Sequence, residues 1–579
     1  MNDNSFQQID LNTDFCVVGG GMAGVCAAVA AARRGAKTIL VQDRPMLGGN
    51  ASSEIRMTIG GAGGNNRKET GILEEIQLEN IRYNPGMQYC IWDHILINFV
   101  QRQKNLKLLL NCSCDGVTMD GNRIQSITAW QMTTQKRFHI SAKYFADCSG
   151  DCVLRISGAE LRRGREARSE FNESHAQEAA DNKTMGNSIL LETKYTGTHR
   201  PYEAPPWAYL FEAKGFHRGL GVRDNYWWLE VGGEQDTVAD AEEIRDELLK
   251  IVHGVWALVK NHPRGFAKNL ELEWMGILPG KRESFRYIGD YTLTQNDIER
   301  QGKFDDIVAY GGWGMDDHNP AAFYFKGAPN LYFPAPSPYG IPFRCLYSGN
   351  IDNLYFAGRN ISCTHIAMSS TRVMATCAIE GQAIGTAAAI GVQYSLDPRG
   401  VYEQRIGELQ KNLMEDDCWI PWHSREVSEI TRNAMLRAES GGDVEVLRNG
   451  IDRGIDGATN CFEADFESYI EYHFDKPTEI NEVRLVFDSN LLDMEYKMMP
   501  YVFPKDGFAK ELPETLLKEF AIEVQKKKDS DEWKEIVYVE DNFQRLVRIP
   551  VHERVTAIRL IPLASWGYEK AKIFSFEVR

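Results

Sequence analysis

Three glycines between an apolar run and a small-residue segment are the residues most clearly suited to chemistry in this sequence. Gly19, Gly21 and Gly24 fit the pattern G-x-G-x-x-G directly after the apolar run 15–18, which predicts a buried strand. In this pattern the first glycine allows a tight turn, the second lets a diphosphate approach the backbone, and the third lets strand and helix pack closely. The free N–H groups at the start of the following helix would meet the diphosphate. The pattern therefore predicts a dinucleotide site.

The residues that end the next expected strand, 38–41, bear on which nucleotide would bind. In many folds with this glycine pattern, a carboxylate at that point holds the adenosine ribose. Here Gln42 stands where the acid is expected, Asp43 follows one residue later, and Arg44 comes next. An amide also hydrogen-bonds a ribose hydroxyl, and an arginine suits a 2′-phosphate. The end of this strand leaves both readings open.

The composition narrows the class of protein. A chain of 579 residues is expected to form roughly two to four domains. Its formal net charge of -16 argues against nucleic acid or an anionic membrane as a partner, since both attract basic surfaces. No apolar run approaches the roughly 18 residues of a membrane span. We expect a small-molecule substrate as the partner, and oligomer formation stays open.

The N-terminal segment and the cysteines point to one compartment. Residues 1–11 are polar and lack the basic and apolar regions of a signal peptide. The 12 cysteines are scattered, and none are spaced as Cys-x-x-Cys or clustered like zinc or iron–sulfur ligands. We therefore expect no metal site and a reducing, cytoplasmic location.

A further glycine pair, Gly48 and Gly49, follows the second expected strand. Together with the first glycine turn, this pair resembles the FAD-binding half of the glutathione-reductase-type flavoproteins. The resemblance implies that FAD is the cofactor and that the second pair backs onto it. A disulfide reductase of that type would carry Cys-x-x-x-x-Cys just after the pair, where this chain has Ala51 and Arg56. Disulfide reduction is therefore not expected.

Two later stretches resemble flavin-binding motifs of the same superfamily. Ser149-Gly150-Asp151 resembles the end of the pattern Asp-x-Thr-Gly-Asp, whose last Asp accepts a hydrogen bond from a ribityl hydroxyl. Ala357-Gly358-Arg359 resembles the strand that returns to the FAD domain. A small-residue helix is expected at 369–390, and the resemblance implies that its N-terminal end faces the flavin C2 carbonyl, where a helix dipole stabilises negative charge. The resemblance covers about residues 12–400.

The resemblance implies a set of cofactor contacts spread over these motifs. The backbone near Cys114 is expected to lie against the adenine, and Asp151 against the ribityl chain. The expected FAD-binding residues are Gly19, Gly21, Met22, Ala23, Gly24, Gln42, Asp43, Arg44, Gly48, Gly49, Asn50, Ser52, Cys114, Gly150, Asp151, Gly358, Arg359 and Ser370.

Residues between the second and third motifs are expected to form an inserted substrate domain of mixed α and β structure. Two of its stretches, 280–291 and 312–320, resemble the FAD-dependent oxidoreductase family found beside sugar-degrading enzymes in bacteria. The resemblance implies that both border the substrate cavity. Aromatic side chains are crowded in this domain; they can stack on sugar faces, but most are expected to form ordinary core.

Oxidation of a C–H bond at a flavin needs a base for the accompanying proton, which makes histidines the first candidates. His365 lies just before the helix expected to face the flavin and is our first choice; a capping or packing role is the alternative. Asp316 and His318 form a second group. Arg282, with Arg286, is expected to anchor a carboxylate or hydroxyls of the substrate, or else to form a surface salt bridge.

Short apolar or alternating segments mark the C-terminal part of the chain. Seven of them, from 469–474 to 574–578, predict a β-sandwich. The segment resembles discoidin-like, galactose-binding-type jelly rolls, which often bind carbohydrate; bracing the enzyme is the other reading. The expected domains are an FAD-binding domain in two parts, 1–155 and 345–395, a substrate domain at 156–344, a helical connector at 396–440 and the sandwich at 441–579.

The predicted fold is an α/β Rossmann-like FAD-binding domain with an inserted α+β substrate domain and a C-terminal β-sandwich (jelly roll). The predicted function is that of an FAD-dependent oxidoreductase acting on a small polar metabolite, a sugar or glycoside alcohol, by hydride transfer to flavin N5. Two alternatives stay open. One is a flavoprotein subunit that passes electrons to a partner, and the other is a non-catalytic carbohydrate-binding protein with a vestigial nucleotide fold.

Overall fold

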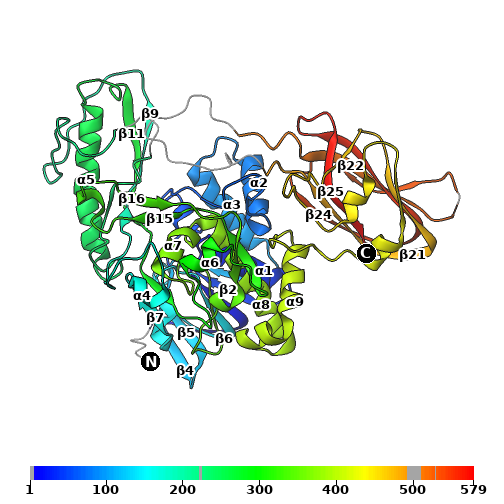
Figure 1. Cartoon of the computed structure of the whole chain (residues 1–579), viewed down its shortest axis with the longest axis horizontal. Helices are drawn as coiled ribbons and strands as arrows, with labels where there is room; N and C mark the ends of the chain where they lie inside the picture. The colour runs from blue at the N-terminus through cyan, green and yellow to red at the C-terminus, as the bar shows by residue number, and fades with distance from the viewer. Residues whose placement is uncertain (1–5, 221–224, 492–509, 529) are drawn as a thin grey trace. The chain divides into compact units, whose positions relative to one another are not determined.

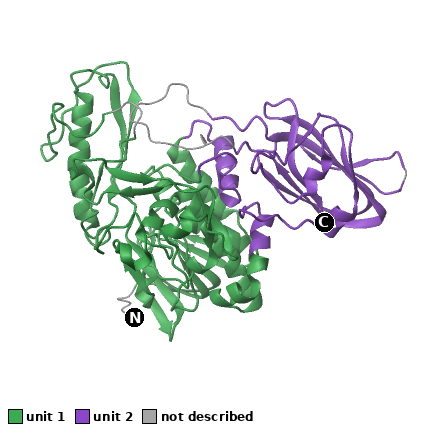
Figure 2. Cartoon of the chain, in the orientation of Figure 1, with its two compact units in different colours: residues 1–62, 88–409, 497–508 green, residues 63–87, 410–496, 509–579 purple. Residues whose placement is uncertain are grey.

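The computed structural model describes residues 6–220, 225–491, 510–528 and 530–579, which fold as two compact units (Figure 2). Of the described residues, the first unit contains 6–62 and 88–409, and the second contains 63–87, 410–491 and 510–579. The segment 63–87 therefore belongs to the second unit, although it lies inside the range that the sequence pattern assigns to the cofactor domain.

A mixed sheet forms the centre of the first unit (Figure 1). Its strands, in spatial order, are β3 (Leu106–Leu109), β2 (Thr38–Val41), β1 (Gln8–Val18), β6 (Lys136–Asp147), β5 (Arg123–Gln131) and β4 (Cys112–Asp120), and β18 (Leu354–Phe356) also pairs with β6. Strands β3, β2, β1, β6 and β18 are parallel, while β4 and β5 run antiparallel. This is the predicted Rossmann-like arrangement, and it gathers the carboxyl ends of the parallel strands at one edge.

The first strand is longer than the apolar run predicts. Its inner half, 15–18, is buried as expected, and its outer half alternates exposed and less exposed side chains and pairs with β6 from Gln8 opposite Arg137. The outer half of β1, whose side chains alternate between polar and apolar, stays extended because it pairs with β6. The second strand begins and ends at the predicted residues, Thr38 and Val41.

Helix α1 (Met22–Arg33) follows the glycine turn and packs on helix α8 (Met374–Tyr394). The two backbones approach closely because the contact side chains are small. A Cβ atom on Gly381 would lie 2.0 Å from the carbonyl oxygen of Ala23, and one on Gly385 would lie 2.1 Å from that of Ala27. Glycines on one helix thus let the other rest directly against it. Helix α3 (Tyr89–Gln101) belongs to the same unit.

The helix predicted at 369–390 is two helices. Helix α7 (His365–Thr371) starts after Thr364, whose side chain accepts a hydrogen bond from the N–H of Ala367, and α8 starts after a bend of 94°. The N–H of Ala375 bonds to the carbonyl of Gly60, so the start of α8 is tied to a loop far away in sequence. Among the described residues no single helix is long and apolar enough to cross a membrane, and only this bent pair passes such a test together.

The region between β6 and β18 contains short strands and one long helix, as the composition predicts. The core around α5 (Ala241–Lys260) contains Tyr226, Trp228 and Trp256, so several of the crowded aromatic side chains are ordinary core. The remaining elements are β7 (Leu161–Arg163), α4 (Arg168–Phe171), β8 (Asn187–Ser188), β9 (Leu191–Tyr195), β10 (Glu230–Val231), β11 (Leu270–Met275), β12 (Gly280–Lys281), β13 (Phe285–Tyr287), α6 (Gln295–Glu299), β14 (Ile307–Gly311), β15 (Met315–His318), β16 (Asn330–Phe333) and β17 (Tyr339–Pro342).

The second unit contains the predicted antiparallel β-sandwich. Its strands are β19 (Met435–Ala438), β20 (Phe462–Ala464), β21 (Ile470–Phe487), β22 (Leu517–Gln525), β23 (Lys534–Val539), β24 (Leu546–Ser565) and β25 (Ala571–Val578). Two pairs of predicted short strands are continuous here, as β21 and β24, which pair along their length across two register shifts. The polar links between the apolar segments stay extended, because a bulge absorbs the mismatch. Helices α2 (Ile72–Tyr83) and α10 (Glu429–Asn433) also lie in this unit, and α9 (Pro398–Glu415) spans the boundary in sequence.

Because α1 and α8 pack so closely at Gly385, we expect that a larger residue at this position destabilises the fold. Gly385→Ala is expected to lower the unfolding midpoint, because overpacking of a tight core contact costs about 1–3 kcal/mol. Gly407→Ala in α9 is the matched control: a Cβ there meets nothing within 4 Å, and alanine in an exposed helix is favoured by about 1 kcal/mol. Thermal unfolding of both variants checks this, and equal midpoints would contradict the close approach.

Candidate functional site

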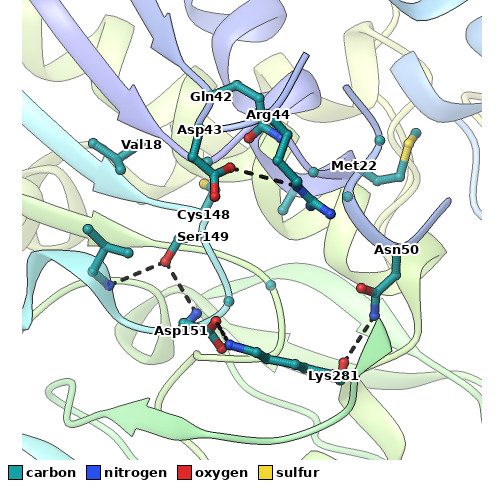
Figure 3. Close-up of a pocket in the computed structure, with 18 of the residues that line it drawn as sticks. Val18, Met22, Gln42, Asp43, Arg44, Asn50, Cys148, Ser149, Asp151 and Lys281 are labelled. Atoms are coloured by element: carbon teal, nitrogen blue, oxygen red, sulfur yellow. Dashed lines mark hydrogen bonds and ion pairs between the residues drawn. The ribbon is translucent and has the colours of Figure 1, made fainter. Parts of the chain in front are cut away.

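A cavity of about 270 Å³ lies at the carboxyl ends of β1, β2 and β6 (Figure 3). Open α/β sheets bind ligands at this edge. The cavity brings together the three stretches that the sequence singles out. A Cβ on Gly19 would lie 2.4 Å from the backbone nitrogen of Ser149, and one on Gly150 would lie 2.9 Å from Nε of Arg359. We name this space the cofactor cavity.

The three glycines of the first turn have separate structural roles. Gly19 has a φ of 104°, which favours glycine. Gly24 packs the helix on the turn, since a Cβ there would lie 1.8 Å from the carbonyl oxygen of Gly19. Gly21 is the N-cap of α1, without a side-chain cap, and a Cβ on it would meet only Gly49, at 3.9 Å. The start of α1 is therefore open toward the cavity, as a bound diphosphate requires.

The amide of Gln42 is used within the protein. Its Oε1 accepts a hydrogen bond from the N–H of Gly20 at 2.7 Å, and its Nε2 donates to the carbonyl of Met46 at 3.1 Å. Gln42 thus lines the cavity but fixes the glycine turn. Asp43, next to it, has 62% of its side chain exposed and lies 3.8 Å from Arg44. Asp43 is therefore the carboxylate available to a ribose at this strand end.

Asp151 joins two further segments at the opposite wall (Figure 3). Its carboxylate accepts hydrogen bonds from Nζ of Lys281 at 2.6 Å, from Nη2 of Arg359 at 2.6 Å and from the hydroxyl of Ser284 at 2.9 Å. Burial opposes ionisation, but Arg359 and Lys281 outweigh it and hold the pKa of Asp151 below its usual value. Asp151 is therefore a carboxylate at neutral pH, ready to accept a hydrogen bond from a hydroxyl.

Most of the expected cofactor residues line this cavity, and three of them, Gly24, Ser52 and Ser370, are not among its lining residues. Gly24 packs the helix on the turn. Ser52 follows the second glycine pair, and its hydroxyl is buried without a partner among the described residues. The hydroxyl of Ser370 donates to the carbonyl of Trp313 at 2.5 Å and hydrogen-bonds to Tyr339 at 2.6 Å. Cys114 lines the cavity, and burial raises the pKa of its thiol to about 12, so it stays protonated.

A second cavity of about 460 Å³ shares part of its wall with the first. Both expected substrate stretches contribute to its lining, through Gly280 to Arg282 and through Trp313, Asp316 and His318. The residues that line both cavities are Asn50, Lys281, Arg359, Arg372 and Met374. A ligand in the second cavity would therefore lie next to a cofactor in the first.

Strand β15 places two of the expected catalytic residues in the second cavity. Side chains alternate along a strand, so Asp316 and His318 share one face, and Asp317 lies on the other. Oδ2 of Asp316 is 3.2 Å from Nε2 of His318, whose Nδ1 is 2.7 Å from Oε2 of the buried Glu230. The pKa of Asp316 is lowered: burial opposes ionisation, but hydrogen bonding by His318 and Asn330 and the charge of Arg372 outweigh it. The ring of His318 is thus fixed between two acids, with Nε2 toward the cavity-lining one.

Arg282 lines the same cavity, but its guanidinium is used within the protein. Nη1 donates to the hydroxyl of Ser188 at 2.7 Å and lies 3.3 Å from Glu230, and Nη2 donates to the carbonyl of Trp227 at 3.0 Å. Arg282 therefore holds Glu230 in place. Arg286 is fully buried elsewhere, between Glu283 and Glu166, so it forms neither a surface salt bridge nor a substrate anchor.

His365 lies outside the lining of both cavities described above. Nδ1 is 3.0 Å from Glu283, and Nε2 is 3.0 Å from Oδ1 of Asp317. Burial alone would lower the pKa of the ring, but Glu283 and Asp317 outweigh it and raise the pKa to about 10. An imidazolium at neutral pH has no free nitrogen for a substrate proton. The geometry thus favours the packing role for His365 and leaves His318 as the histidine at the cavity.

Sequence reasoning missed Glu230, Lys281 and Arg372. Glu230 is an acid inside the apolar run 228–231, which is a signal for a buried partner. Lys281 directly precedes Arg282, which was proposed from the sequence as a substrate anchor. Arg372 is a charged residue within a stretch of small ones, the place where the expected helix breaks. Within the described residues, no three or more His, Cys, Asp or Glu side chains are arranged to hold a metal ion.

Comparison with known proteins identifies a protein family that matches most of the chain. The model of the family described as FAD dependent oxidoreductase matches residues 14–413. No curated protein matches the chain. The family 32 carbohydrate-binding module from Streptococcus pneumoniae EndoD is 16% identical over 26% of this chain and 99% of that chain, with a TM-score of 0.20.

Two solved structures are similar to the larger part of the chain. A geranylgeranyl bacteriochlorophyll reductase-like protein from Thermoplasma acidophilum is 12% identical over 71% of this chain and 88% of its own, with a TM-score of 0.32. The OxyS anhydrotetracycline hydroxylase from Streptomyces rimosus is 8% identical over 70% of this chain and 69% of its own, with a TM-score of 0.32. Likenesses of this size assign no ligand or reaction to the chain.

The residues of the cofactor cavity fit FAD. The uncapped start of α1 and the open side of Gly21 suit a diphosphate, and Asp43 suits the adenosine ribose. Asp151, with its lowered pKa, suits a ribityl hydroxyl. Met374 and Cys377, in the first turn of α8, line the same cavity, so the positive end of that helix faces it.

Asp151→Asn is expected to weaken FAD retention about tenfold, because the variant loses a charge-assisted acceptor while keeping its shape. The ratio of flavin to protein after extended dialysis measures this. Asp352→Asn is the matched control, since Asp352 is exposed and lines neither cavity. Equal flavin content in the two variants would remove Asp151 from the cofactor site.

The raised pKa of His365 predicts a pH dependence of stability. A histidine titrates near 6.5 in the unfolded chain and near 10 here, so its contribution is complete below about pH 6.5 and is lost as pH rises through about 10. The stability advantage of the wild type over His365→Gln should fall by up to about 1.4 kcal/mol per pH unit between these values. Unfolding midpoints from pH 6 to 10 measure it, and a difference that does not change with pH would contradict the assignment.

Proposed function

Because the chain belongs to the FAD dependent oxidoreductase family, we propose that it oxidises a hydroxyl group of a small polar metabolite, a sugar or glycoside alcohol. The observation that carries the proposal is the second cavity, which shares five lining residues with the cofactor cavity and presents His318 between two acids. A substrate there would be next to the cofactor and within reach of a base.

The size and lining of the second cavity suit a monosaccharide. A space of about 460 Å³ lies within the range of small-molecule sites. Trp227 and Trp313 line it and offer flat apolar faces, while Asn50, Thr58 and Asn225 offer hydrogen-bonding groups. A sugar ring has both kinds of surface, and this mixture supports the substrate class.

When bound in the cofactor cavity, FAD would supply the two-electron oxidant for the C–H bond of the alcohol. The chain must take the proton from the hydroxyl while the C=O bond forms. We assign this role to His318, which lines the second cavity with Nδ1 next to Glu230 and Nε2 next to Asp316. Glu230 and Asp316 then stabilise the imidazolium, as the acid of a catalytic triad does for its histidine. Arg282 keeps Glu230 ionised and in place.

His318→Gln is expected to keep its yellow flavin and to lose about 100-fold or more in the rate of flavin reduction by substrate, the usual effect of a lost base. His199→Gln is the control, because His199 is an exposed residue outside both cavities. Anaerobic stopped-flow absorbance with a panel of sugars and glycosides measures the rate.

Two results would contradict this proposal. An unchanged rate in His318→Gln would remove His318 as the base. Binding of sugars without reduction of the flavin would favour a non-catalytic carbohydrate-binding protein.

A further inference from the structure

The second cavity has a charge opposite to that of the whole chain. Its charged lining residues are Lys281, Arg282, Arg359, Arg372 and Asp316, which are four bases and one acid. The formal net charge of the chain is -16. A cleft with low-dielectric walls focuses the field of its own charges, so this cavity attracts anions although the protein as a whole repels them.

Each of the four bases contacts an acid at or next to the cavity. Arg282 donates to Ser188 and Trp227 and pairs with Glu230. Lys281 and Arg359 share one carboxylate, that of Asp151. The described acids that contact the four bases are Asp151, Glu230 and Asp316. The four bases therefore exceed the three acids that contact them by one, and this net positive charge suits a ligand that carries a negative charge.

Arg372 has unused hydrogen-bonding capacity. Its Nη2 donates to the backbone carbonyl and the carboxylate of Asp316, at 3.1 and 3.3 Å. Within the part of the chain that the structure describes, its Nε is buried without a partner, and no acceptor lies on its Nη1. A guanidinium presents five donors in a planar fork, so the two donors of Nη1 remain for a ligand in the cavity that Arg372 lines.

The surroundings of Arg372 also suit an anion. Arg372 stands in the break between α7 and α8, directly before the N-cap of α8, Val373, which makes no side-chain cap. The positive end of this long helix adds to the charge of the guanidinium. Thr58 lines the same cavity, and its hydroxyl is buried without a partner among the described residues. Unpaired buried polar groups are costly, and a ligand that bonds to them removes the cost.

We infer that the substrate carries a carboxylate in addition to the hydroxyl that is oxidised, and that Arg372 binds this carboxylate. The substrate class is then that of the sugar acids, such as uronic acids and their glycosides. The inference rests on the proposed function for the oxidation itself, but the anion site stands on the charges and the unused donors of the second cavity. Arg372 takes the anchoring role that the sequence suggested for Arg282.

The test compares two ligands that differ only at C6, methyl β-D-glucuronide with a carboxylate and methyl β-D-glucoside with a hydroxymethyl group. The wild-type holoenzyme should be reduced by the glucuronide with a kcat/KM at least about tenfold higher. In Arg372→Gln the value for the glucuronide should fall about 10- to 100-fold, the usual effect of a lost charge-assisted hydrogen bond. The ratio of the value for the glucuronide to the value for the glucoside should fall about tenfold or more. Arg300→Gln, at an exposed position, is the control.

Binding provides a second measurement that needs no turnover. Tetrahydropyran-2-carboxylate has the ring and the carboxylate but no hydroxyl to oxidise. Calorimetry on the oxidised holoenzyme should give a dissociation constant that rises about tenfold or more in Arg372→Gln and less in Arg372→Lys, which keeps the charge but not the fork. The wild type should bind the neutral tetrahydropyran more weakly.

The outcomes separate the two proposals. Equal reduction by glucuronide and glucoside, with no effect of Arg372→Gln, overturns the carboxylate site and leaves the proposed oxidation standing. Arg372-dependent binding of tetrahydropyran-2-carboxylate without flavin reduction by either glycoside supports the anion site and overturns the oxidation. Loss of FAD from Arg372→Gln places this residue at the cofactor and overturns the inference.

Discussion

The pairing of Asp151 with Lys281 and Arg359 is the contact on which the site depends. These residues come from the end of β6, from β12 and from the turn after β18, and they meet at the wall between the two cavities. These side chains are partly buried, and removing one of them leaves a charge uncompensated, which costs more than the contact itself contributes. The cofactor cavity and the second cavity therefore keep their relative positions because one carboxylate binds both walls.

The parts of this fold that the sequence predicted are those determined by local residues. Gly19, Gly21 and Gly24 specify the β1–α1 turn through backbone freedom and close packing, which need no distant partner. The end of β2 was also predicted, because the apolar run of this strand stops at Val41. The strands of the C-terminal sandwich were recognisable from alternation, but not their fusion into β21 and β24, because the register shifts depend on the neighbouring strand.

The parts that the sequence did not predict depend on distant contacts. The start of α8 after the break is hydrogen-bonded to Gly60, a residue far away in sequence, and within the helical stretch the charged Arg372 marks the break. His365 is close to the flavin motif in sequence, but its ring is held by Glu283 and Asp317. The bases of the second cavity come from separate segments, so their surplus over the acids is visible only in three dimensions. The net charge of the whole chain argued only against nucleic acid and an anionic membrane as partners, and it does not report the charge of a single cavity.

Strand β15 carries two neighbouring aspartates on opposite faces, and each of them contacts a different histidine. Asp316 contacts His318 in the second cavity, and Asp317 contacts the buried ring of His365. A single-residue insertion or deletion would exchange the two faces, because the repeat of a strand is two residues. Relatives that act on different molecules can therefore diverge by substitutions around the cavity. The length of β15 cannot change in the same way, because the contacts of Asp316 and Asp317 on its two faces would both be lost.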